Sequence, residues 1–286
     1  MKYLDGISKR IGLHLASQRR KAFSGAIRKG KLPLFGSPES IDFEIISFSG
    51  SRDFEEQMLS ILTFIHHAGM PRIWTLYSDG SHKADEKSFL NQHFPFVRFK
   101  LWNENQKIER YPLLEKYLDS CHLAKKLHAI LTHPIEGQTI YTDSDVVFYP
   151  NISLYFSSPL LQSGLWYMSD TNWDSFRKQN AGELKKMYHL NSGFMVLNKT
   201  FDFNLNLEYF ENLNLQFTYF SEQNSFDYSF GKQKTSLLDP RQFIVSTDDQ
   251  FNLNTTYLPE KIALRHYINP VRHKMWQYGW KWHLKK

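Results

Sequence analysis

The sequence predicts an α/β fold with a mostly parallel central sheet flanked by helices. From Phe43 onward, short apolar segments typical of strands alternate with longer segments of helical periodicity. Polar turns that contain glycine or aspartate follow several of these strands. The chain has 286 residues, 41% hydrophobic and 16% aromatic, which suffices for one large buried core or two small ones.

The first 35 residues predict one or two amphipathic basic helices. Apolar residues recur at near-helical spacing among nine lysines and arginines, and Asp5 is the only acid in this segment. Two interpretations remain open: attachment to an anionic membrane surface, or packing on the domain with a solvated basic face. Prolines and a glycine follow between residues 32 and 38. We therefore expect a helical arm over residues 1–40 and one domain over residues 41–286.

The next segment predicts a βαβαβ unit followed by a long helix. The first helix begins at Asp53, where Glu56 completes a capping-box-like pattern. The last helix opens at Pro112 and is expected to continue to about Leu131. The three strands of the unit are expected at residues 43–48, 72–77 and 96–101.

A fourth strand, residues 139–142, leads directly into two acids, Asp143 and Asp145. The residues flanking Ser144 can point both carboxylates into one small volume at the carboxyl end of the strand. Two such carboxylates repel each other unless a cation lies between them. Hard oxygen ligands suit Mg²⁺ or Mn²⁺, and those ions often bind phosphate as well. The pattern predicts a metal–diphosphate site.

Polar residues after the first two strands would lie at the same edge of the sheet, where open parallel sheets bind ligands. Ser49, Gly50 and Asp79 are candidate nucleotide contacts, although ordinary turn chemistry also explains them. The sequence has no Gly-x-Gly-x-x-Gly motif and no Walker loop. These absences argue against a dinucleotide-binding fold and a P-loop.

The later part of the chain predicts strands at residues 164–170 and 191–198, and a helix just after Glu222 and Gln223. Asp248 and Asp249 are interpreted as a helix or turn cap, with an acceptor contact as the alternative. Tryptophan and tyrosine alternate from Trp276 onward. A packed terminal strand explains this pattern, and so does a membrane-interface belt or a sugar-stacking platform.

Charge is segregated along the chain, whose net charge is +6 and whose pI is 9.1. Both ends are basic and residues 36–260 are acidic overall. No nucleic-acid motif is present, so we expect a phosphate-bearing ligand or an anionic membrane surface as partner, and no nucleic acid. The lone Cys121 cannot form an internal disulfide, and neither a signal peptide nor a membrane span is expected. A cytoplasmic protein is predicted, with attachment at the cytosolic membrane face left open.

Four segments occur in order along the chain: Ile140–Val147, Asn191–Val196, Glu222–Phe226 and Leu264–Trp276. Together they resemble motifs of GT-A glycosyltransferases, and are most similar to the glycogenin/galactosyltransferase-like family 8. The resemblance implies a Rossmann-like GT-A domain that transfers a sugar from a nucleoside-diphosphate sugar, with uridine favoured. It implies an unknown glycan, lipid or protein as acceptor, and retention at the anomeric carbon.

The resemblance also implies roles for individual residues. Asp143 and Asp145 form an Asp-x-Asp motif: Asp145 holds a Mn²⁺ or Mg²⁺ ion, and Asp143 is shared between the ion and the donor ribose. His266 is the third metal ligand. The segment after His266 departs from the family pattern, so either Arg272 or Lys274 is expected to contact the diphosphate. Lys126, or its neighbour Lys125, is the expected basic donor contact. The sugar and acceptor side is expected to be lined by Asn191, Ser192, Gly193, Glu222 and Gln223.

Catalytic contacts are expected from Asp143, Asp145, Glu222 and Gln223, with Glu222 where the family has aspartate. Two alternatives remain. A haloacid-dehalogenase-like phosphatase would use Asp143 as nucleophile, but that motif normally lies on the first strand of the chain, and here it follows three strands. A non-catalytic sugar-nucleotide-binding protein would keep the fold without turnover.

Overall fold

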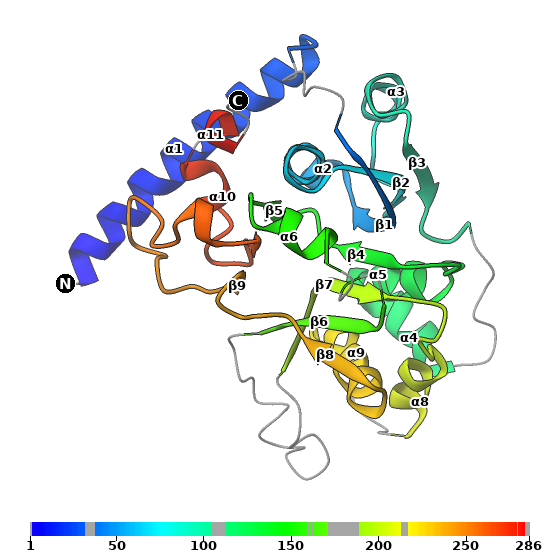
Figure 1. The fold of residues 1–286 in the computed structure, drawn as a ribbon. Coiled ribbons are helices and arrows are strands. Elements are labelled where there is room, and N and C mark those ends of the chain that lie inside the picture. The colour runs from blue at the N-terminus through cyan, green and yellow to red at the C-terminus, as the bar shows by residue number, and fades with distance from the viewer. Residues whose placement is uncertain are drawn as a thin grey trace.

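The computed structural model describes residues 2–31, 38–104, 112–158, 161, 163–170, 189–212, 217–278 and 280–283. Helices surround a seven-stranded sheet, and a three-stranded sheet lies beside it (Figure 1). The strand order of the large sheet is β3-β2-β1-β4-β7-β6-β8. Its strands are β1 (Ser40–Ser49), β2 (Met70–Ser78), β3 (Val97–Leu101), β4 (Thr139–Thr142), β6 (Leu165–Ser169), β7 (Leu190–Leu197) and β8 (Thr235–Leu237).

Strands β3, β2, β1 and β4 run parallel, as the alternation of strands and helices predicts. β7 runs antiparallel to both of its neighbours, β4 and β6. β6 pairs in parallel with β8. The predicted mostly parallel α/β fold is therefore confirmed, with one reversed strand among the described ones.

Both faces of the sheet are buried. Successive residues of β1 and β4 point to opposite faces, so Ile45 and Ile140 join one apolar core while Ile46 and Tyr141 join the other. The first core also contains α2 (Phe54–Ala68), which packs with the short α6 (Ile152–Phe156). The helices of the second core are α4 (Pro112–Ser120), α5 (His122–Leu131), α8 (Asn204–Asn212) and α9 (Ser221–Lys232). α3 (Ala84–His93) packs beside β3.

Helix α2 begins where expected, but the predicted capping box is wrong. The side chain of Asp53 makes no hydrogen bond to the start of the helix. It accepts a hydrogen bond from Arg272 at 2.8 Å, while Glu56 accepts from Arg20 at 2.7 Å and from the Trp276 indole at 2.9 Å. Both acids thus bind partners that are distant in the sequence, and their bonds to the two arginines are charge-assisted.

The single helix predicted from Pro112 to Leu131 is two helices. Cys121 has extended backbone angles, φ −143° and ψ 129°, and separates α4 from α5. Each half follows a different partner: α4 contacts α8, and α5 contacts α9. Helical periodicity runs through the break because both halves face the same core.

Of the interpretations of the segment from Trp276 onward, the packed terminal strand is wrong. The segment forms two short helices, α10 (Lys274–Gln277) and α11 (Trp280–His283), which pack on α1 (Lys2–Arg28) (Figure 1). The Phe23 ring of α1 lies 5.2 Å from Trp276 and 5.4 Å from Trp280. The arm is thus one continuous helix held against the body; the boundary at residue 40 stays a prediction. Within the described residues, no helix is both long and apolar enough to cross a membrane.

The small sheet has the order β5-β10-β9. β10 pairs antiparallel with β5 and parallel with β9. Because β4 belongs to the large sheet and β5 to the small one, residues 143–145 form the link between the two sheets. The strands are β5 (Val146–Phe148), β9 (Phe243–Val245) and β10 (Leu264–His266).

Candidate functional site

The two acids of the 143–145 link are fixed by backbone hydrogen bonds from both sheets. The Asp143 amide donates to the Gly193 carbonyl of β7 at 2.9 Å. The Tyr267 amide, just after β10, donates to the Asp145 carbonyl at 2.9 Å. The junction therefore presents both carboxylates on a rigid frame, as functional groups on regular elements require.

Asp143, Asp145 and His266 form a cluster in which one ligand atom from each residue lies within 4.8 Å of the others. Nε2 of His266 lies 3.1 Å from an Asp145 oxygen and 3.6 Å from an Asp143 oxygen. Antiparallel pairing places His266 of β10 opposite Val146, next to Asp145. The structure thus brings together the three residues that the resemblance implies as metal ligands.

The His266 ring is oriented by β7. Its Nδ1 lies 2.8 Å from the side-chain oxygen of Asn191, an acceptor, so Nδ1 carries the proton and Nε2 faces the two acids. The ring also lies directly on Gly193, where a Cβ would be 2.2 Å from the ring carbon Cε1. Gly193 is thus required for the close approach of the histidine.

The two carboxylates of this cluster require a positive charge close to them. Burial disfavours the imidazolium of His266, but the neighbouring Asp145 and Asp143 outweigh burial and raise the pKa of His266. Burial would also raise the pKa of Asp145, yet His266 and Arg272 hold it below its ordinary value. Two carboxylates and one oriented imidazole nitrogen are a ligand set that a divalent ion such as Mn²⁺ accepts, so the residues fit the implied ion.

A second cluster joins Lys126 of α5 to Glu222 of α9. The Lys126 ammonium is buried and lies 3.1 Å from Asp143, 3.3 Å from Glu222 and 3.1 Å from the Ser192 hydroxyl. Burial opposes its charge, but Asp143 and Glu222 together raise the pKa of Lys126. Burial raises the pKa of Glu222 despite the attraction of Lys126. The positive charge of Lys126 therefore compensates two carboxylates: that of Asp143, which belongs to the metal-ligand cluster, and that of Glu222.

Arg272 supplies a cation beside Asp145. Its guanidinium donates to Asp53 at 2.8 Å, and its Nε lies 3.6 Å from Asp145. The backbone turns sharply after Arg272, and Lys274 points elsewhere: it is buried and donates to the carbonyls of Asn252 and Asn254. Of the two predicted phosphate contacts, only Arg272 lines the pocket.

These residues surround a pocket of about 530 Å³. Asp170, at the end of β6, accepts hydrogen bonds from the amides of Asn191 at 3.2 Å and Gln223 at 3.0 Å. Tyr219 and Phe220 expose aromatic rings at the rim. The pocket therefore has carboxylates at its floor that require a cation, amide and hydroxyl groups along its wall, and aromatic rings at its rim.

The structure brings together most of the predicted site residues. Glu222 and Gln223 lie inside the first turn of α9, where the sequence placed them before the helix. Ser49, Gly50 and Asp79 lie at the ends of β1 and β2, on the same sheet edge but outside the lining of this pocket. The predicted residues that line it are Lys126, Asp143, Asp145, Asn191, Ser192, Glu222, Gln223, His266 and Arg272.

Sequence reasoning missed three of the residues that contribute to the site. The Tyr141 hydroxyl donates to Asp143 at 2.5 Å, and the rings of Tyr219 and Phe220 form the rim. Tyr141 had a signal, because residues two apart in an extended segment share a face. The rim residues had none, since the turn before α9 places them.

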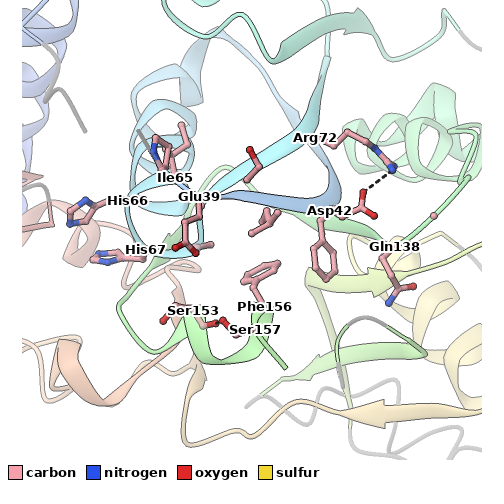
Figure 2. A pocket seen from close by; sticks show the side chains of 17 residues that line it. Glu39, Asp42, Ile65, His66, His67, Arg72, Gln138, Ser153, Phe156 and Ser157 are labelled. Atoms are coloured by element: carbon pink, nitrogen blue, oxygen red, sulfur yellow. Dashed lines mark hydrogen bonds and ion pairs between the residues drawn. The ribbon is translucent and has the colours of Figure 1, made fainter. Parts of the chain in front are cut away.

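A larger hollow of about 670 Å³ lies at the opposite end of the sheet, around the amino ends of β1 and β4 (Figure 2). Arg72 there is paired with Asp42 at 3.0 Å, and the pKa values of His66 and His67 are lowered, chiefly by burial. Amino ends of strands are not where such sheets bind ligands. We assign the site to the smaller pocket, where the metal-ligand cluster lies.

No protein-family model matches the sequence, and no curated protein sequence matches it. The fold has clear relatives among solved structures. The galactosyltransferase LgtC, solved with donor and acceptor sugar analogues, aligns over 84% of this chain and 95% of its own, at 13% identity and TM-score 0.55.

Two other glycosyltransferases are similar at the same level. GlyE of Streptococcus pneumoniae TIGR4 aligns over 85% of this chain and 62% of its own, at 11% identity and TM-score 0.53. The bifunctional WbbM aligns over 89% of this chain and 51% of its own, at 12% identity and TM-score 0.54. The chain thus has the GT-A fold of these glycosyltransferases, as the resemblance of its motifs to family 8 implied.

Proposed function

We propose that this protein is a metal-dependent glycosyltransferase that moves a sugar from a nucleoside-diphosphate sugar, a uridine one in particular, to a glycan, lipid or protein acceptor. The observation that carries the proposal is the Asp143–Asp145–His266 cluster at the base of the pocket, with its histidine oriented by Asn191. Its place at the carboxyl ends of β4 and β10 is where an open sheet binds a nucleotide.

A divalent ion held by Asp143, Asp145 and His266 would act as a Lewis acid that stabilises the departing diphosphate. The nitrogen ligand favours Mn²⁺ over Mg²⁺. Arg272, kept beside the cluster by Asp53, adds a second fixed positive charge and hydrogen-bond donors for phosphate oxygens. Preformed charges of this kind cost no rearrangement as the leaving group develops its charge.

Lys126, Ser192 and Glu222 form the wall beside Asp143, and Gln223 with Asp170 extends it toward the rim. This wall suits the donor sugar hydroxyls. Ser49, Gly50 and Asp79, farther along the sheet edge, are proposed to contact the nucleoside. Tyr219 and Phe220 offer apolar faces on which an acceptor sugar ring can stack.

We favour retention at the anomeric carbon. An inverting transfer requires a carboxylate placed to accept the acceptor proton. The described carboxylates of the pocket already have donors: Glu222 has Lys126 and Ser192, Asp170 has two amides, and the remaining two acids belong to the metal cluster. Identification of the product anomer by NMR tests this point.

The phosphatase alternative is not favoured. Asp143 is held by the Tyr141 hydroxyl and by Lys126, and the histidine on its other side suits a shared cation better than an attacking carboxylate. The fold similarity is to glycosyltransferases.

A thermal-shift screen of nucleotides and nucleotide sugars, each with and without Mn²⁺, tests the proposal. We expect a uridine diphosphate or its sugar to raise the melting temperature only when Mn²⁺ is present, since ligand binding to the folded state alone stabilises it. Failure of every diphosphate nucleotide to stabilise the protein would overturn it. Asp145→Asn provides the control, because it should abolish the shift.

A further inference from the structure

Helix α1 has two apolar faces, and only one of them is used by the fold. Ala16, Phe23 and Ile27 are buried against the body. Leu4, Ile7 and Ile11 lie on the other side and are 69%, 40% and 45% exposed. The spacing of these three residues, i, i+3 and i+7, makes them one ridge on the first turns of the helix.

A loop from a distant part of the sequence extends this ridge. The Ser8 hydroxyl donates to the Phe251 carbonyl, and the Lys274 ammonium of α10 donates to the Asn252 carbonyl, so residues 251–254 are tied beside the start of α1. Phe251 and Leu253 are 42% and 48% exposed. We call the five side chains Leu4, Ile7, Ile11, Phe251 and Leu253 the apolar ridge.

Cations accompany the ridge. Arg10, Lys21 and Lys29 are exposed along the outward side of α1 and the turn that follows it, and no exposed residue of α1 is acidic. Arg20 pairs with Glu55 at 3.1 Å and Glu56 at 2.7 Å, and the exposed Arg28 pairs with Asp85 at 2.8 Å. Arg10, Lys21 and Lys29 have no ion pair of this kind among the described residues, so the outward side combines aliphatic groups with positive charge.

We propose that the apolar ridge and its flanking cations dock on an anionic lipid bilayer. A helix with exposed aliphatic side chains and a basic flank lies in the headgroup region of such a bilayer, with its apolar groups shallowly inserted. A nucleic acid would match the cations but leave the aliphatic ridge without a partner. A second copy of the chain in a symmetric contact would bring two surfaces of the same positive charge together.

The surface is presented rigidly. Gly12 of α1 packs so closely on α10 that a Cβ there would lie 2.1 Å from the Gln277 side chain. Arg272 of the pocket lies two residues before α10. The segment that packs against α1 therefore lies close in sequence to the pocket wall. The docking inference does not depend on the reaction proposed for the pocket.

Vesicle flotation of the full chain tests the inference. We expect binding to phosphatidylcholine vesicles with about 30% phosphatidylglycerol, little binding to pure phosphatidylcholine, and loss of binding as salt screens the charges. The triple variant Leu4→Ser, Ile7→Ser, Ile11→Ser and the triple variant Arg10→Gln, Lys21→Gln, Lys29→Gln should each weaken binding at least about tenfold.

Matched variants elsewhere on the protein test whether vesicle binding depends on the apolar ridge and its cations, or on any exposed apolar side chain or positive charge. Leu154→Ser removes a leucine that is 64% exposed on α6, and Lys199→Gln, Lys232→Gln, Lys234→Gln removes three exposed lysines. Both should bind vesicles like wild type. Equal losses in these controls, no binding to anionic vesicles at low salt, or tighter binding to an RNA oligonucleotide than to vesicles would overturn the inference. So would a dimer in sedimentation that the apolar-ridge variant abolishes. Unchanged melting temperatures show that the ridge variants remain folded.

Discussion

The orientation of His266 depends on one amide, that of Asn191. Asn191→Ala removes the acceptor at Nδ1, so the ring loses its fixed tautomer and its direction toward the acids. We predict about 10- to 100-fold weaker Mn²⁺ binding by calorimetric titration. Asn198→Ala, at the other end of the same strand, removes a side chain that bonds the Gly164 carbonyl and should bind Mn²⁺ like wild type. Equal affinities for all three proteins would contradict the assigned tautomer.

The positive charge of Lys126 stabilises the carboxylates of Asp143 and Glu222 in a largely buried site. Lys126→Met leaves Asp143 and Glu222 without their cation, and breaking a buried pair on one side costs about 3–5 kcal/mol of folding free energy. Denaturant unfolding measures this loss. The double variant Lys126→Met, Glu222→Gln removes one of the stranded charges and should recover part of the stability. A double variant less stable than the single one would show that Lys126 serves another partner.

For single residues, the sequence identified candidates for the site but could not always decide which candidate reaches the pocket. Either Arg272 or Lys274 was expected to contact the diphosphate, and the sequence left the choice open. Residues two positions apart in a helical turn point to opposite sides, so only one of the two side chains could reach the pocket. Which of them does so depends on how α10 packs against α1. That docking is tertiary information. Asp143, Asp145 and His266 could be predicted because a strand end and an ordered set of motifs define them locally.

Among the elements, β10 owes its position to a buried ion pair. Arg265 is fully buried, donates twice to Asp249 at 2.7 and 2.8 Å, and lies between the rings of Tyr257 and Tyr267, each 4.7 Å away. Asp249, expected to be a cap or an acceptor contact, is instead part of this structural pair. The pair fastens the loop before β10 and thereby the strand that carries His266.

Asp249→Asn should therefore destabilise the protein strongly. The change leaves the Arg265 guanidinium buried with reduced compensation, and we predict a loss of about 3–5 kcal/mol in denaturant unfolding. The adjacent Asp248 is exposed and accepts a hydrogen bond from the Tyr257 hydroxyl at 3.1 Å. Asp248→Asn should cost no more than about 1 kcal/mol. Similar losses for the two variants would contradict the structural importance of the pair.

Helix α11 introduces a pH dependence of stability. Burial lowers the pKa of His283 to about 3, whereas an unfolded histidine titrates near 6.5. Between these values the unfolded state binds a proton that the folded state does not. His283 therefore lowers stability as pH falls from about 6.5 toward 3, by about 1.4 kcal/mol per pH unit. His283→Phe should flatten the measured curve over this range. Parallel curves for the two proteins would show that His283 is not buried in its neutral form.

Element types were predicted well wherever a segment pairs with its neighbours in sequence, and poorly where distant partners decide. β4 has the predicted bounds, Thr139–Thr142, because an apolar run and a polar turn define it. The break at Cys121 and the helices at the C-terminus follow from the partners they pack on, α8, α9 and α1. The periodicity of apolar residues indicates which face of a helix or strand is buried, but it does not indicate which other element covers that face.

At the scale of the whole molecule, the alternation of strands and helices sufficed for the parallel part of the sheet. It did not predict the reversed β7 or the small β5-β10-β9 sheet, in which β5 pairs with β10, a strand more than one hundred positions later in the sequence. Pairing across such distances leaves no local signature. The site is built where these two unpredicted features meet, so the cluster of acids and histidine could be anticipated but its geometry could not.

The most direct test is release of uridine diphosphate from uridine-diphosphate sugars by the purified chain, with Mn²⁺ and with a chelator. We predict metal-dependent release that falls about 100-fold or more in Asp145→Asn, because a site charge that stabilises the leaving group is lost. Asp42→Asn, on an aspartate 88% exposed at the far end of the sheet, should retain the wild-type rate. Release that persists at full rate with the chelator, or in Asp145→Asn, would contradict a metal–diphosphate site at the junction of the two sheets.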